Sequence, residues 1–152
     1  MNLDFKKLWN AHPTNKGIKN PCTTNGVVNF DNQCAIRMGV CLNSAGVSTA
    51  SFRGAKCYPG HGHNSSHILR AEELAKWMVK NPAFFGNVDK KIGTSSADYT
   101  DKKGIVFFLN FWGRGNQGDH IDLWNGSKMC YGDPSYFGRS KAVWFWEIKD
   151  AN

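Results

Sequence analysis

The pattern of apolar and polar residues predicts helices in the first part of the chain. Residues 3–10 form an amphipathic segment, which predicts a short helix that ends before Pro13. Residues 31–44 predict a second helix, which stops near Gly46. Positions 35–42 of this second segment are apolar almost all round, so we expect it to form a buried central helix.

The later part of the chain predicts one more helix and then a run of strands. Ser65 or Ser66 can cap a helix that reaches about Lys80. Its inner side would carry Leu69, Leu74, Trp77 and Met78. Strands are predicted at residues 105–112, 120–124, 127–131 and 142–148. Helices come first and strands later, without a linker or a repeat. This order predicts a single α+β domain over residues 1–152, with an antiparallel sheet.

A hairpin signal lies at Asn125-Gly126, between two of the predicted strands. A two-residue turn there pairs Trp124 with Ser127, Asp122 with Met129 and His120 with Tyr131. Because side chains alternate across a strand, one face then carries His120, Asp122, Met129, Tyr131 and, beyond them, Asp133. If this face meets the buried helix, His120 points toward the helix start, where Cys34 lies.

A cysteine at a helix start and a histidine on a strand favour nucleophilic catalysis. The thiolate is the nucleophilic form of Cys34, and the partial positive charge of a helix N-terminus favours it. His120 would hold the proton and later give it to the leaving amine. The backbone amide of Cys34 and the side chain of Gln33 are candidates to stabilise the oxyanion. A third residue should orient the imidazole, and both Asp133 and Asp122 are candidates for this role.

Charge and hydropathy restrict the partners and the export route. The formal charge of +7 and the pI near 9.3 favour an anionic partner. The basic residues are scattered, which argues against a nucleic-acid-binding module. The sequence shows neither the apolar run of a signal peptide nor the ~20 apolar residues of a membrane span. We therefore expect a soluble cytoplasmic product that would need a dedicated machine for export.

The chain has an odd number of cysteines, namely Cys22, Cys34, Cys41, Cys57 and Cys130. This number suits one reactive thiol and up to two disulfides in an oxidising compartment, without fixing their connectivity. Cys34 and Cys41 would lie two turns apart on one helix, about 10 Å along its axis. A disulfide needs Cα atoms within about 7 Å, so this pair is excluded.

Three segments resemble a known family. They are Asn-Pro-Cys-Thr-Thr-Asn-Gly at 20–26, Asn-Phe-Asp-Asn-Gln-Cys-Ala-Ile-Arg-Met-Gly at 29–39 and Gly-Asp-His-Ile-Asp-Leu-Trp-Asn-Gly at 118–126. Together they resemble the type VI secretion amidase effectors of family 4, over roughly residues 5–148. The resemblance implies a papain-like, NlpC-type fold, in which a central N-terminal helix carries the cysteine and packs on an antiparallel sheet that carries the histidine.

The resemblance also implies an antibacterial function. Such effectors are injected by a type VI secretion apparatus into the periplasm of another bacterium. There they hydrolyse the γ-D-glutamyl–meso-diaminopimelate bond of peptidoglycan stem peptides, and an immunity protein protects the producer. Carried over by motif, Cys34 is the nucleophile, His120 the general base and Asp133 the third member. No cofactor, metal, nucleic acid or membrane insertion is implied.

Two rival functions follow from other features of the sequence. Cys57, His61, His63 and His67 could hold zinc in a metal-dependent wall hydrolase, although their spacing matches no standard zinc finger. A cationic, aromatic-rich domain could instead bind wall polymers without cutting them.

The glycine-rich segment 113–118 formally matches a dinucleotide-binding fingerprint, but a strand follows it where that motif needs a helix. We therefore interpret it as a loop at the rim of the cleft.

Overall fold

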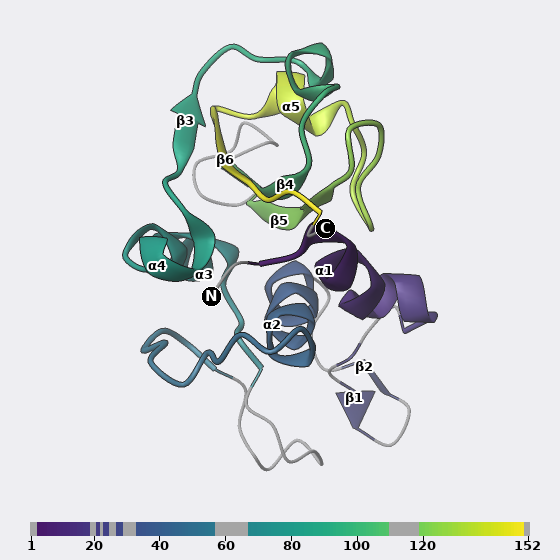
Figure 1. The fold of residues 1–152 in the computed structure, drawn as a ribbon. Helices are drawn as coiled ribbons and strands as arrows, with labels where there is room; N and C mark the ends of the chain where they lie inside the picture. Colours follow the sequence, from purple (N-terminus) through teal and green to yellow (C-terminus); the bar gives the residue numbers. More distant parts are fainter. Residues whose placement is uncertain are drawn as a thin grey trace.

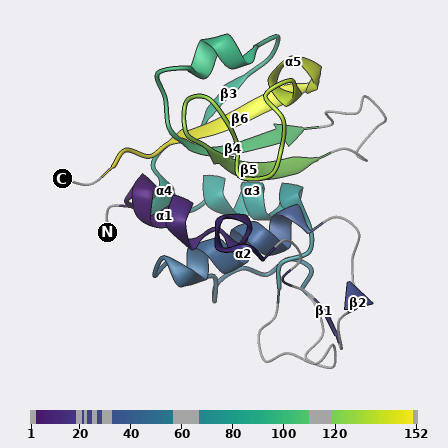
Figure 2. The same cartoon turned by 90° about the vertical axis from the view of Figure 1, so that its right-hand side faces the viewer.

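The computed structural model places helices on one face of a four-stranded antiparallel sheet, and a short helix with loops on the other (Figures 1 and 2). It describes residues 3–18, 21, 23–24, 27–28, 33–56, 67–109 and 119–150. Within these ranges no helix combines the length and the apolar character that a membrane crossing requires. The layered arrangement confirms the predicted α+β fold class.

The central helix lies in the helical layer beside the N-terminal helix (Figure 2). The helical elements are α1 Phe5–Ala11, η1 Pro13–Lys16, α2 Cys34–Ser44, α3 Ala71–Val79, α4 Pro82–Phe85, η3 Ser96–Tyr99 and α5 Tyr136–Arg139. Asp4 caps α1 by accepting a hydrogen bond from the Lys6 amide at 3.1 Å. Helix α2 begins at Cys34 and is buried along most of its length. The prediction of a buried central helix is therefore confirmed.

The third predicted helix starts later than the sequence suggested. Helix α3 begins at Ala71 rather than near residue 65. Just before it, Ile68 forms a β-bridge with Lys56, and the Leu69 amide donates to the Ala55 carbonyl at 3.1 Å. These backbone groups are used for pairing with another segment, so they are not available to the first turn of a helix.

The main sheet has the strand order β3-β6-β4-β5, with β5 at one edge. Its strands are β3 Asp89–Lys91, β4 Gly104–Leu109, β5 His120–Trp124 and β6 Ala142–Glu147, and a separate small sheet pairs β1 Thr23–Thr24 with β2 Val27–Val28. Three predicted strands are confirmed, although residues 110–112 of the first lie outside the described residues. The strand predicted at 127–131 is wrong, because there only Met129 forms a bridge, with Trp124.

The two faces of the sheet bury different side chains. On one face, Ile105, Phe107, Ile121 and Leu123 pack with the helices α1, α2 and α3. On the other, Val106, Phe108 and Trp124 pack with Tyr99 and with Phe137 of α5. His120 pairs with Phe108, and Asp122 with Val106, so both belong to the second face. The expectation that the whole His120 face packs on the buried helix is therefore wrong, because the alternate residues Ile121 and Leu123 fill that position. At the edge strand β5, however, His120 itself contacts Cys34 at the helix start, as predicted.

The hairpin after β5 has a different register from the predicted one. Trp124 faces Met129, and the Asn125 amide donates to the Lys128 carbonyl at 3.1 Å. The two turn residues are thus Gly126 and Ser127, not Asn125 and Gly126, and the pairing is shifted by two residues. The cause is local: the Asn125 side chain accepts hydrogen bonds from the Ser127 and Lys128 amides at 3.0 and 2.9 Å. Gly126 has φ 103°, which glycine adopts without strain.

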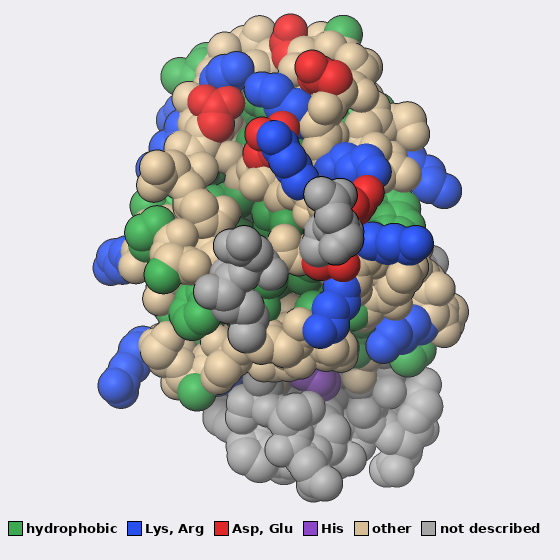
Figure 3. Space-filling model, in the orientation of Figure 1, with side chains coloured by type: hydrophobic (Ala, Val, Ile, Leu, Met, Phe, Trp, Pro, Cys, Tyr) green, Lys and Arg blue, Asp and Glu red, His purple; other side chains and the backbone are tan. Residues whose placement is uncertain are grey.

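Charged side chains are distributed widely over the surface. In the face shown in Figure 3, Lys and Arg side chains are spread over the molecule, with Asp and Glu among them, and do not form one continuous stripe. This agrees with the scatter of basic residues along the sequence. On this face, the positive charge of the described residues is therefore spread out rather than gathered in one continuous strip.

Candidate active site

The start of α2 meets the start of β5. Cys34, the first residue of α2, is 4% exposed, and its Sγ lies 4.0 Å from the carbonyl oxygen of Asp119. His120 follows as the first residue of β5, and its imidazole forms a hydrogen bond with the Cys34 thiol. Two residues that are 86 positions apart in the sequence therefore lie side by side.

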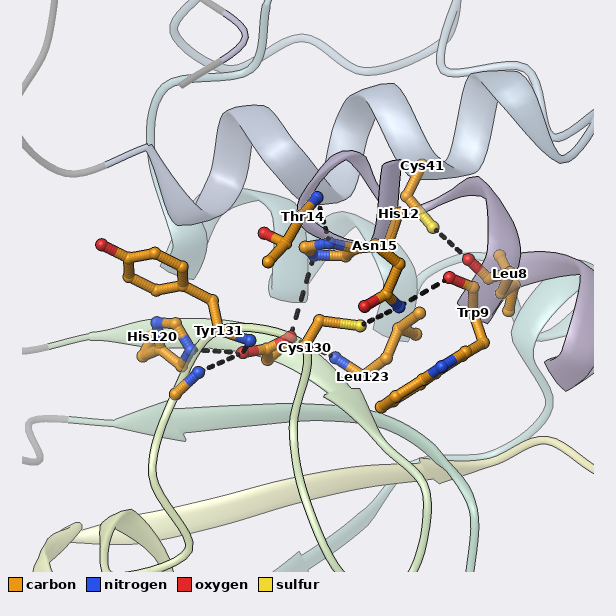
Figure 4. Close-up of polar contacts among 12 residues, drawn as sticks. Leu8, Trp9, His12, Thr14, Asn15, Cys41, His120, Leu123, Cys130 and Tyr131 are labelled. Carbon is orange, nitrogen blue, oxygen red and sulfur yellow. Dashed lines mark hydrogen bonds and ion pairs between the residues drawn. The ribbon is translucent and has the colours of Figure 1, made fainter. Parts of the chain in front are cut away.

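Asp122 holds the other side of the His120 ring. The Nε2 atom of His120 lies 2.8 Å from Oδ2 of Asp122, and both side chains are buried (Figure 4). Because Nε2 contacts the carboxylate, Nδ1 is the ring nitrogen that remains for the thiol. The order thiol, imidazole, carboxylate is the arrangement that activates a cysteine nucleophile.

Backbone amides complete the environment of the Asp122 carboxylate. Its Oδ1 accepts a hydrogen bond from the Leu123 amide at 2.8 Å. Its Oδ2 accepts from the Tyr131 and Gly132 amides at 3.0 and 2.8 Å. A buried carboxylate that accepts several N–H hydrogen bonds is stabilised in its ionised form. The chain after the hairpin thus bends toward Asp122 instead of continuing as a strand.

Burial and pairing oppose each other in this pair. Burial raises the pKa of Asp122. The hydrogen bond to His120 and the charge of His120 lower this pKa by a larger amount, so the net shift is downward. Burial lowers the pKa of His120, but the hydrogen bonds to Asp122 and Cys34 and their charges raise it above its ordinary value. The pair is therefore ionic at neutral pH, and the imidazolium lies beside the sulfur of Cys34. An imidazolium can supply a proton to a leaving group.

Asp133, the predicted third member, lies elsewhere. It is exposed, and its Oδ1 accepts a hydrogen bond from the Ser135 amide at 2.8 Å. The carboxylate on the imidazole is Asp122, which the sequence offered as the rival candidate. The physical reason is the early end of the hairpin pairing: the chain turns away at Tyr131 and Gly132, whose amides bond to Asp122, so position 133 never comes opposite His120.

Two aromatic rings and a glycine fix the position of the imidazole. The ring of Phe108 lies nearly parallel to that of His120, with centroids 6.2 Å apart, and Tyr136 approaches edge-on at 5.3 Å. Gly132 lies against the same ring: a Cβ placed there would be 2.8 Å from Nε2 of His120 and 2.8 Å from Cε2 of Tyr136. A side chain at position 132 would therefore compete for the space that the imidazole occupies.

Replacing Gly132 with alanine is expected to displace His120 from Asp122. We expect kcat to fall by about 10- to 100-fold, because small displacements of catalytic groups have effects of this size. The unfolding free energy should fall by about 1–3 kcal/mol through overpacking. Gly138→Ala is the matched control, since a Cβ there meets only the Thr94 carbonyl oxygen, at 3.9 Å. Equal kcat values for the two variants would contradict the argument.

The helix start provides the candidate oxyanion donors. The amide of Cys34 is among the first four of α2, which have no acceptor within the helix. Gln33 occupies the N-cap position and is fully buried beside it. Both groups therefore remain close to the nucleophile, as the sequence predicted, and their role in stabilising an oxyanion stays a prediction.

The other described cysteines are poor nucleophiles. Cys34, Cys41 and Cys130 are free thiols in this structure, and Cys34 and Cys41 lie on the same helix, α2, as the sequence predicted. Cys22 and Cys57 lie outside the described residues. Burial raises the pKa of Cys41 and of Cys130 far above that of an ordinary thiol. Among the three, Cys34 is the one that contacts a histidine paired with a carboxylate.

One group of side chains has the composition of a metal site. Ligand atoms of His12, Asp122 and Cys130 lie within 4.8 Å of one another. However, Nδ1 of His12 accepts a hydrogen bond from the Thr14 amide at 3.2 Å, so a neutral ring carries its hydrogen on Nε2. In this tautomer the nitrogen that faces Asp122 has no lone pair for a cation. Of the zinc cluster that the sequence offered as a rival possibility, His67 is buried and the other members lie outside the described residues.

Sequence reasoning did not single out several residues that shape this site. His12 lies far from the motifs along the chain, and no spacing marked it. Gly132, by contrast, stands in Tyr-Gly-Asp-Pro, a turn-forming run that could have indicated an early end of the second hairpin strand. Phe108 and Tyr136 carried no local sign of contact with His120.

Comparison with solved structures places this fold among known effectors. The effector of the Tae4/Tai4 effector–immunity system of Salmonella typhimurium matches with a TM-score of 0.72 and 23% identity, over 97% of this chain and 99% of the other. The type VI effector Tae4 of Enterobacter cloacae matches with a TM-score of 0.70 and 22% identity, over 98% of each chain. At these identities the likeness establishes the fold, which is papain-like and NlpC-type.

A comparison with curated proteins finds no match. The family model described as type VI secretion system (T6SS), amidase effector protein 4, matches residues 30–146, a segment that includes both Cys34 and His120. This segment covers most of the chain. The protein therefore belongs to the family of type VI secretion amidase effectors 4, which are antibacterial enzymes that cut peptidoglycan.

Proposed function

We propose that this amidase effector hydrolyses the γ-D-glutamyl–meso-diaminopimelate bond of peptidoglycan stem peptides, with Cys34, His120 and Asp122 as its catalytic residues. Family membership supports the enzyme class. The observation that carries the assignment of residues is the unbroken contact from the thiol through the imidazole to a buried carboxylate. Asp122 takes the role that the sequence analysis gave to Asp133.

In the first step the sulfur of Cys34, whose thiol proton has passed to Nδ1 of His120, attacks the carbonyl carbon of the scissile amide as a thiolate. A C–S bond forms, and the carbonyl π electrons move to the oxygen, next to the amide of Cys34 at the helix start. His120 then gives its proton to the amide nitrogen, the C–N bond breaks, and the diaminopimelate amine leaves. The γ-D-glutamyl group remains on the enzyme as a thioester.

In the second step water hydrolyses the thioester. The neutral imidazole of His120 takes a proton from water, whose oxygen attacks the carbonyl carbon. The C–S bond breaks, the γ-carboxylate is released, and Cys34 and His120 return to their initial states. Asp122 keeps Nε2 protonated throughout, so Nδ1 is the atom that exchanges protons with substrate and water.

The expected place of action follows from the family and the surface charge. Effectors of this family are delivered into target cells. We propose that this one acts in the periplasm, where the anionic wall is exposed to a protein of formal charge +7. We also propose that residues 1–152 form one catalytic domain.

A protein inhibitor is expected in the producing cell. Tae4 effectors from Salmonella typhimurium and Enterobacter cloacae were each solved in complex with an immunity protein, Tai4. We propose that this chain has a cognate immunity protein of its own, which protects the producer.

Mass analysis of digested sacculi tests the bond and the mechanism together. Purified protein should release fragments that end in D-glutamate with a free γ-carboxyl group, matched by fragments that begin with meso-diaminopimelate. Prior alkylation with iodoacetamide should abolish the release, because it blocks the thiol. EDTA should leave it unchanged. Fragments cut elsewhere would refute the proposed bond, and loss of activity with EDTA but not with iodoacetamide would favour the zinc-dependent alternative.

A further inference from the structure

His12 lies directly behind the carboxylate that holds the catalytic imidazole. It follows α1 and precedes η1, and it is 1% exposed. Its Nε2 is 3.8 Å from Oδ1 of Asp122, while Oδ2 of the same carboxylate contacts His120 (Figure 4). Two histidines from different elements thus face the two oxygens of one buried aspartate.

The tautomer of His12 is determined by its own local contact. Nδ1 accepts a hydrogen bond from the Thr14 amide at 3.2 Å and is therefore unprotonated. A neutral ring then carries its hydrogen on Nε2, the atom that faces Asp122. At 3.8 Å this N–H is too far for a full hydrogen bond. Such contacts in resting enzymes often tighten in the complex with substrate.

His12 carries no charge at neutral pH. Burial lowers its pKa to about 4, against the opposing effect of the Asp122 charge. Arg37 from α2 and His120 from β5 also disfavour a second positive charge here. The Cys130 thiol is also close, and burial keeps it protonated because its pKa is raised. Neutral His12 therefore faces the Asp122 carboxylate with the Nε2–H bond and adds no charge. The positive charge of the proposed triad resides on His120 alone.

We propose that His12 is a positioning residue of the proposed catalytic triad. Its Nε2–H faces Oδ1 of Asp122, and together with the Leu123 amide it holds that oxygen in place. Because a carboxylate is rigid and planar, fixing Oδ1 also fixes Oδ2 against the imidazole of His120. This role rests on the proposed function, since it acts only through Asp122.

The tautomer can be measured on the wild-type protein. Two-dimensional ¹H–¹⁵N NMR through long-range couplings distinguishes protonated from unprotonated ring nitrogens. His12 should show a protonated Nε2 and an unprotonated Nδ1. It should not titrate between pH 5.5 and 8, because the lower end of this range already lies about 1.5 units above its shifted pKa. A proton on Nδ1, or a charged ring at pH 7, would overturn the proposal without bearing on the roles of Cys34 and His120.

Two substitutions separate positioning from simple packing. His12→Asn keeps an acceptor for the Thr14 amide but removes the donor toward Asp122, while His12→Gln can place an amide N–H near the position of Nε2. We expect kcat to fall by about 10- to 100-fold in the Asn variant with KM unchanged, and to recover most of its value in the Gln variant. The far-downfield ¹H resonance of the His120 Nε2 proton should shift or broaden in the Asn variant only.

The remaining outcomes are decisive. If both variants lose stability alike but keep wild-type kcat and the His120 resonance, His12 serves packing only and the proposal fails. If EDTA inactivates the wild-type protein and zinc restores it, His12, Asp122 and Cys130 form a metal site instead. If Cys34→Ala remains active, the proposed function fails, whereas the tautomer of His12 is unaffected by that result.

Discussion

Replacing Cys34 with alanine is expected to reduce kcat on purified muropeptides by on the order of 10⁶-fold, the size of effect produced by loss of a covalent nucleophile from a catalytic triad. The substitution removes the sulfur that attacks the scissile carbonyl and leaves His120 and Asp122 in place. Chromatographic detection of the product fragments over long incubations measures the residual rate.

The control for this variant removes another thiol. Cys130→Ala eliminates a half-buried cysteine that hydrogen-bonds to Asn15, and it should keep nearly wild-type activity. In Cys34→Ala the unfolding free energy should change by about 1 kcal/mol, because a single buried atom is deleted. Robust cleavage by a correctly folded Cys34→Ala protein would rule out the nucleophile and, with it, the thioester mechanism.

Replacing Asp122 with asparagine is expected to reduce kcat by about 10⁴-fold, whereas Asp133→Asn should have little effect. The asparagine carbonyl oxygen would still accept from the Tyr131 and Gly132 amides. That oxygen also contacts Nε2 of His120, so the neutral amide keeps this contact but loses the negative charge that stabilises the imidazolium. Its NH₂ group would meet the Leu123 amide, another donor, at the former Oδ1 position. Without that negative charge His120 holds the thiol proton less well, so the nucleophile is not activated.

The two aspartates form a matched pair for this test. Asp133 is exposed, and within the described part of the chain its side chain bonds to the nearby Ser135 amide, so its replacement should leave both the fold and kcat near wild type. Steady-state rates on the same muropeptide, together with thermal unfolding of each variant, separate loss of catalysis from loss of fold. A large fall in kcat for Asp133→Asn with a near-normal Asp122→Asn would reverse the assignment and restore the one predicted from sequence.

The catalytic candidates themselves could be predicted because local signals mark them. The run of apolar residues after Cys34 predicts a buried helix with the cysteine near its start, and α2 begins there. The alternation in His-Ile-Asp-Leu-Trp predicts a strand, and β5 spans those five residues. Both signals depend on side-chain periodicity within one segment, which short-range physics controls.

The hairpin register was predictable only in part. The turn signal Asn125-Gly126 correctly indicated a reversal of the chain, but Gly126 and Ser127 became the turn residues. The alternatives differ by one residue in turn position, and both place glycine where it is tolerated. What selected between them was a side-chain contact, from Asn125 to the amides beyond the turn. The alternation of apolar and polar residues along a strand does not predict such contacts.

The amino-acid sequence by itself determined the fold class, the helix that carries Cys34 and the strand that carries His120, because each depends on periodicity within a short segment. Only the tertiary structure decided which aspartate orients the imidazole. Asp122 is selected because the Tyr131 and Gly132 amides, from beyond the hairpin turn, and the ring of His12, from the other end of the chain, converge on its carboxylate. These contacts depend on how separate elements pack, and no local pattern encodes that arrangement.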